Sequence, residues 1–175
     1  MTRQNKPAKA HELFWVGDVD DDTLARLINE IREVQAEDPK ALFDLWIKTG
    51  GGDFTVVAAF LDFVRVKKVN LVTTALGDVA SAGLFLFGAG KVRRATKLTK
   101  FYFHKVCVNF DLDRDVNLPQ MKVDSRNLEE RHEESITILM SLYKLSRRAV
   151  EDLLDSEKRW TAKEMKVKGL IHEII

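Results

Sequence analysis

The sequence is poor in residues that constrain a chain, with one cysteine, Cys107, and three prolines among its 175 residues. A single cysteine excludes an intramolecular disulfide and a cysteine-rich metal site, and it fits a reducing compartment. Long hydrophobic runs are also missing. The longest apolar stretch near the centre, Ala82–Gly90, is far shorter than the roughly 20 residues of a membrane-spanning helix. The polar start, Met1–Lys9, lacks the apolar run of a secretory signal. We therefore expect a soluble, cytoplasmic protein with no membrane partner.

Neither sign of charge is in excess, because 28 Lys and Arg stand against 27 Asp and Glu, for a formal net charge of +1. Binding to nucleic-acid phosphates favours a large basic excess, so no nucleic-acid partner is expected. The 45% hydrophobic and 31% charged content is typical of a folded globular chain. A chain of this length buries about 70% of its unfolded surface around one core. We expect a single domain over residues 1–175.

Short apolar runs, glycine breaks and helical spacing of apolar residues alternate along the chain. The expected strands are 13–16, 41–47, 70–75, 91–95, 100–108 and 170–175. The expected helices lie between Asp20 and Asp38, over 54–64, from Ser81, over 125–145, around 150–154 and between Thr161 and Gly169. Gly77 is expected to turn the chain, and residues 109–124 to be irregular. Two strand–turn–helix units with glycine at their turns indicate a layered α/β domain.

The first glycine turn, Thr49–Asp53, contains three consecutive glycines before a helix. Glycine lets backbone N–H groups approach a ligand, and unsatisfied N–H groups at a helix start favour developing negative charge. This is the chemistry of an oxyanion hole. A plain flexible turn is the alternative, since glycine is common in turns. The spacing matches neither the phosphate-loop pattern nor G-x-G-x-x-G.

The second turn, Gly77–Gly83, places Ser81 among small residues at the head of a buried helix. Ser81 is a candidate nucleophile, or else an N-cap residue of that helix. Val79 stands where the G-x-S-x-G elbow has its first glycine. His104, expected in mid-strand, is the candidate base for a serine proton, or else a structural histidine. No histidine pair has metal-ligand spacing, so neither metal nor cofactor is expected.

The order of these motifs resembles the proteolytic subunit of the Clp protease over Glu12–Ile175. The similar segments are Leu13–Gly17, Ala36–Pro39, Leu45–Gly52, Gly77–Gly83, Phe101–His104 and the ending from Thr161 to Ile175. The resemblance implies the layered α/β fold shared with crotonases, with a protruding handle made of a strand and a long helix. It divides the chain into a tail (1–11), a core (12–108), a handle region (109–145) and C-terminal helices with a strand (146–175).

The same resemblance implies the site. Ser81 would attack the peptide carbonyl, His104 would act as the base, and the N–H groups of Gly52 and Ala82 would hold the oxyanion. Counting back from Thr161 places the family's aspartate on Glu157, and Asp155 is a substitute two residues away. The implied activity is that of a serine endopeptidase on peptides or unfolded proteins.

The implied assembly is a homo-oligomer of two stacked seven-membered rings, with an unfolding ATPase as a candidate partner. Three features depart from the family: Glu157 in place of aspartate, Gly50 in place of proline, and only residues 1–12 before the first strand. Two alternatives stay open. One is a catalytically impaired ring subunit with a structural role. The other is a crotonase-type acyl-CoA enzyme, which shares the fold and the backbone oxyanion hole.

Overall fold

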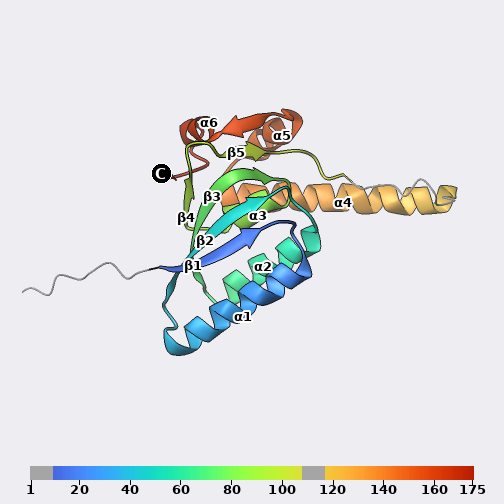
Figure 1. The fold of residues 1–175 in the computed structure, drawn as a ribbon. Coiled ribbons are helices and arrows are strands. Elements are labelled where there is room, and N and C mark those ends of the chain that lie inside the picture. Colours follow the sequence, from blue (N-terminus) through green and yellow to red (C-terminus); the bar gives the residue numbers. More distant parts are fainter. Residues whose placement is uncertain (1–9, 108–116) are drawn as a thin grey trace, which may run out of the picture. The chain divides into compact units, whose positions relative to one another are not determined.

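The computed structural model describes residues 10–107 and 117–175. They belong to two compact units, one with the described residues up to Tyr102 together with Arg159–Ile175, and one from Phe103 to Lys158. Figure 1 traces the elements of both units in chain order. No helix among the described residues combines the length and apolar character needed to cross a membrane.

The first unit is built on a sheet in the order β1-β2-β3-β4-β7, in which all neighbours are parallel. β5 pairs in parallel with the end of β3, and β6 pairs antiparallel with β5. The strands are β1 His11–Val16, β2 Leu42–Thr49, β3 Asn70–Ala80, β4 Val92–Ala95, β5 Lys100–Tyr102, β6 Arg159–Thr161 and β7 Glu173–Ile174. The helices of this unit are α1 Asp21–Glu37, α2 Phe54–Val66, α3 Gly83–Gly88 and α6 Ala162–Val167. This mixed α/β architecture with a parallel sheet confirms the predicted fold class.

The core of the first unit lies between one face of the sheet and the helices α1 and α2, which run side by side along it (Figure 1). Alternate strand residues such as Trp15 and Phe43 are fully buried, and so are Leu27 of α1 and Phe60 of α2. The indole of Trp15 meets the ring of Phe60 edge to face, with centroids 5.8 Å apart. The period-2 pattern of the strands and the 3.6-residue pattern of the helices thus meet in one apolar layer.

A polar cluster crosses three neighbouring strands on the other face of the sheet. Thr74 Oγ1 in β3 donates to Asp44 Oδ1 in β2 at 2.8 Å, and the guanidinium of Arg94 in β4 pairs with Asp44 Oδ2. Arg94 Nε also donates to Thr74 Oγ1 at 3.2 Å. Asp44 is 5% exposed, so a shift in strand pairing would leave a buried charge without its partner, at a cost of several kcal/mol. This cluster therefore favours the observed register.

Two sequence predictions about strand ends are wrong. Gly77 does not end its strand, because β3 continues to Ala80. The glycine has a φ of +63° and lies where the pairing of β3 with β2 shifts register. Glycine at a positive φ is the usual way to accommodate a bulge inside a strand. β5 ends at Tyr102 rather than near 108, so His104 follows the strand instead of lying within it. Val108 lies outside the described residues.

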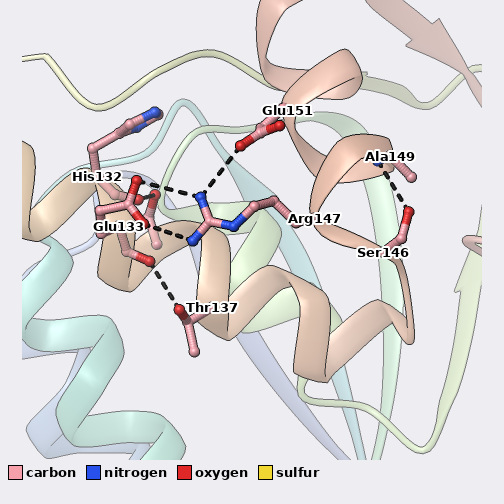
Figure 2. A network of polar contacts seen from close by, with 8 residues as sticks. His132, Glu133, Thr137, Ser146, Arg147, Ala149 and Glu151 are labelled. Atoms are coloured by element: carbon pink, nitrogen blue, oxygen red, sulfur yellow. Dashed lines mark hydrogen bonds and ion pairs between the residues drawn. The ribbon is translucent and has the colours of Figure 1, made fainter.

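The second unit contains α4 Leu118–Tyr143 and α5 Arg147–Asp155. The two helices are joined by Arg147, whose guanidinium donates to Glu133 of α4 at 2.6 Å and to Glu151 of α5 at 3.2 Å (Figure 2). The bond from Arg147 lowers the pKa of the Glu133 carboxyl below its ordinary value. Ser146 caps α5 through the amide of Ala149.

The long helix begins earlier than predicted. Residues 118–124 belong to α4 rather than to an irregular segment, whereas residues 109–116 of that segment lie outside the described residues. Pro119 does not prevent this, because it stands in the first turn, where backbone N–H groups have no intrahelical partner. Asn117 caps the helix by accepting from the amide of Gln120 at 2.9 Å.

We expect Gly90→Ala to destabilise the protein by about 1–3 kcal/mol, because a methyl group there would lie 2.3 Å from Thr73 Oγ1 and 2.8 Å from Thr73 N, inside the core. Gly50→Ala is the control, since a methyl group at Gly50 would meet nothing within 4 Å. Urea unfolding of both variants measures the difference. Equal midpoints for the two variants would contradict the packing.

Candidate active site

The two glycine turns predicted from the sequence lie against each other. The first turn follows β2, and only Ser81–Gly83 of the second segment follow β3, which continues to Ala80. β2 and β3 are adjacent and parallel, so both strands end at the same edge of the sheet. A methyl group added at Gly51 would come within 2.6 Å of Ser81 Cβ and 3.1 Å of Ser81 Oγ. The middle glycine of the first turn therefore touches the candidate nucleophile of the second.

Thr49 and Val19 hold the first turn in place. Gly51 N donates to the Thr49 hydroxyl at 3.0 Å, and Gly51 O accepts from the amide of Val19 at 2.9 Å. A methyl group at Gly52 would lie 2.5 Å from Val19 O. Gly51 and Gly52 have φ values of +114° and +148°. Packing and backbone conformation both require glycine at these two positions, which favours a built site over a plain flexible turn.

Sequence reasoning assigned no role to Thr49 or Val19. A threonine two residues before a glycine is a recognised turn signal, so the role of Thr49 was accessible from the sequence. Val19 carries no such signal. Its contact with Gly52 is an isolated bridge between segments far apart in the chain.

Ser81 has a strained backbone. Its φ is +52°, in the left-handed region that costs a non-glycine residue of order 1 kcal/mol or more. Within the part of the chain that the structure describes, the three other non-glycine residues with positive φ are Lys68, Lys144 and Glu157, which stand at the C-terminal ends of helices, where this conformation is usual. Of these four residues, only Ser81 follows a strand. A serine in a strained strand-to-helix turn is the geometry of a nucleophile elbow, reached here without the first glycine of that motif.

Ser81 does not cap the short helix that follows. Ala82 is the N-cap residue of α3, and no side-chain hydrogen bond caps it. The Ser81 amide donates to Tyr102 O at 3.1 Å, and Ser81 O accepts from the amide of Leu84 at 3.0 Å. The main chain of Ser81 is thus held on both sides, and the interpretation of its side chain as an N-cap is wrong.

The amides of Gly52 and Ala82 are the predicted oxyanion donors. Across residues 10–107 and 117–175, neither N–H donates to a protein acceptor, whereas the amides of Gly51, Asp53 and Ser81 all do. Gly52 is exposed and Ala82 is 4% exposed. Backbone donors without an acceptor are what an oxyanion hole requires.

His104 and the candidate acids belong to the second unit. His104 is half-buried, and its Nδ1 lies 2.6 Å from the carbonyl oxygen of Lys105. Asp155, the substitute acid, forms an ion pair with Lys105 Nζ at 2.6 Å. The hydrogen bond to Asp155 and the charge of that carboxylate raise the pKa of Lys105, and the charge of Glu157 raises it further. Glu157 is exposed and has a φ of +43°.

The predicted residues therefore fall into two groups. Gly52, Ser81 and Ala82 lie together in the first unit, and His104, Asp155 and Glu157 lie in the second. Sequence reasoning missed the involvement of Lys105, because a lysine beside a histidine has no distinctive pattern. Among the described residues, no group of three or more His, Cys, Asp or Glu side chains is arranged to hold a metal ion.

Comparison with known proteins gives two findings. A model of the Clp protease family matches residues 2–175. The chain is also 34% identical, over 79 residues, to the ATP-dependent Clp protease proteolytic subunit 2 of Bifidobacterium longum (strain NCC 2705). That alignment spans 45% of this chain and 38% of the relative.

The strain at Ser81 predicts an effect on stability. We expect Ser81→Gly to be more stable than Ser81→Ala by about 0.5–1 kcal/mol, because both lack the hydroxyl and only glycine adopts a positive φ freely. Ala80→Gly, one residue earlier in β3, is the control and should lose about 0.5–1 kcal/mol. Thermal unfolding compares the three variants. A Ser81→Gly variant no more stable than Ser81→Ala would contradict the strain.

Proposed function

Because the chain belongs to the Clp protease family, we propose that it is a serine-type endopeptidase that cleaves peptides or unfolded proteins. The name of the Bifidobacterium relative, a proteolytic subunit, supports the reaction class. The observation that carries the proposal is the contact of the Gly51 turn with Ser81, whose backbone is held at φ +52°. A strained serine against a turn with a free N–H group is suited to acyl transfer.

In the proposed mechanism, Ser81 Oγ attacks the carbonyl carbon of the scissile peptide bond, while His104 Nε2 accepts the hydroxyl proton. The Gly52 and Ala82 amides donate to the oxyanion that forms. His104 then returns the proton to the leaving amine, and water hydrolyses the acyl-enzyme by the same route in reverse. The free state of both amides supports this assignment.

Glu157 is our candidate for the carboxylate that stabilises protonated His104. The carboxylate of Asp155 is already paired with Lys105 at 2.6 Å, so part of its charge is compensated. Glutamate serves in place of aspartate in other serine hydrolases.

The proposed working form is a homo-oligomer of two stacked seven-membered rings that encloses the active sites in a chamber. The formal net charge of +1 suits a subunit that packs against copies of itself, since a large like charge would repel. The relative's description as an ATP-dependent subunit makes an unfolding ATPase the candidate partner.

We expect a fluorophosphonate probe to label the wild-type protein and not Ser81→Ala, whose peptidase activity should fall at least about a thousandfold. Intact-mass spectrometry and cleavage of a fluorogenic peptide measure the two effects. Native mass spectrometry of both proteins tests the rings and shows that the variant still assembles. Rings without any Ser81-dependent hydrolysis would identify a structural subunit instead.

The candidate acids are separated by a second comparison. Glu157→Gln keeps the shape of the side chain and removes its charge, so we expect kcat to fall by about tenfold or more. Asp155→Asn should cost about fivefold or less, because its charge is engaged by Lys105. Steady-state kinetics on one peptide ranks the two variants. A larger loss for Asp155→Asn would reassign the acid.

A further inference from the structure

The hydrogen bond of the His104 ring identifies which of its nitrogens carries the proton. A backbone carbonyl oxygen only accepts hydrogen bonds, so Nδ1, at 2.6 Å from Lys105 O, must be the donor. A neutral imidazole with its proton on Nδ1 has its lone pair on Nε2. That tautomer is the one a general base needs.

The side chain of Lys105 makes a second contact, with a carboxylate. Its Nζ pairs with Asp155 Oδ1 at 2.6 Å, and Asp155 is the last residue of α5. At its other end, α5 is fixed to α4 by the bonds of Arg147 to Glu133 (Figure 2). The side chain of Lys105 therefore ties the segment that bears the carbonyl to a helix with a defined position in the same unit.

We propose that Lys105 is the positioning residue for His104: its carbonyl oxygen sets the tautomer of the ring, and its ion pair with Asp155 holds that carbonyl in place. This inference rests on the proposed function. It divides two tasks that one aspartate performs in a conventional triad. The Lys105 carbonyl selects the tautomer, and the charge of Glu157 stabilises the imidazolium.

The first test measures the tautomer without measuring activity. The full-length protein labelled with ¹⁵N-histidine is studied by long-range ¹H–¹⁵N correlation at a pH well above the ordinary histidine value of about 6.5, and His104→Gln assigns the signal. We expect a protonated Nδ1 in the wild type and in Glu157→Gln. A proton on Nε2 in the wild type, or one that moves to Nε2 in Glu157→Gln, would overturn the proposal.

The second test isolates the carbonyl. Replacing Val106 with the corresponding α-hydroxy acid turns the Lys105–Val106 amide into an ester, whose carbonyl oxygen is a weaker acceptor. The same change at Cys107 is the matched control, because it weakens the neighbouring carbonyl of Val106 instead. We expect the Nδ1–H population of His104 to fall with the first ester only. Equal populations with the two esters would contradict the role of the Lys105 carbonyl.

The third test addresses the ion pair. Both of its side chains are more than half exposed, so we expect Lys105→Met to lower kcat by about two- to fivefold with KM unchanged. Lys105→Arg should restore kcat, and Lys105→Met with Asp155→Asn should lose no more than either single change. Additive losses would overturn the coupling.

These readouts separate the inference from the function on which it rests. Probe labelling of Ser81 together with an Nε2–H tautomer would remove only the role of Lys105. An Nδ1–H tautomer in a protein whose Ser81 is never labelled would support the Lys105 contact and remove the peptidase.

Discussion

β2 and β3 run parallel through the first unit, with Leu42 beside Asn70 and Thr49 beside Val79. The candidate site depends on this pairing, because it brings the turns after the two strands to one edge of the sheet. The pairing is supported by the Asp44 cluster on one face and by the apolar layer on the other. A one-residue slip would break both, and it would also separate Gly51 from Ser81.

The glycines at this edge illustrate how packing limits the sequence near the site. Gly83 has no room for a side chain, because a methyl group would lie 2.2 Å from Thr49 Cγ2. Ser81 likewise leaves no room for a side chain at Gly51. These close contacts restrict the backbone around Gly51 and Gly83. Ser81 can therefore keep a positive φ that an isolated serine would avoid. Close packing therefore maintains the strained backbone of Ser81, and together they hold the Ser81 hydroxyl at the end of β3.

The second unit holds its side chains differently. Its described polar contacts include exposed ion pairs, such as Lys105 with Asp155 and Arg147 with Glu133. Pairs of this kind contribute little stability individually, and salt weakens them further. Salt-sensitive contacts thus lie near the base, whereas close packing holds the serine and the glycine turn.

The sequence by itself determined the fold class, the glycine turn after β2 and Ser81 as the candidate nucleophile, because the order of several individually weak motifs is specific. It also predicted the helix between Thr161 and Gly169, which the structure confirms as α6, with a capping box of Thr161 and Glu164 at its start. It misjudged Gly77 and the end of β5, since strand pairing, a non-local interaction, determines where β3 and β5 end. Only the tertiary structure decided that Gly51 touches Ser81 and that Lys105 contacts both His104 and Asp155. Residues far apart in the chain make most of these contacts, and no local pattern encodes which of them will meet.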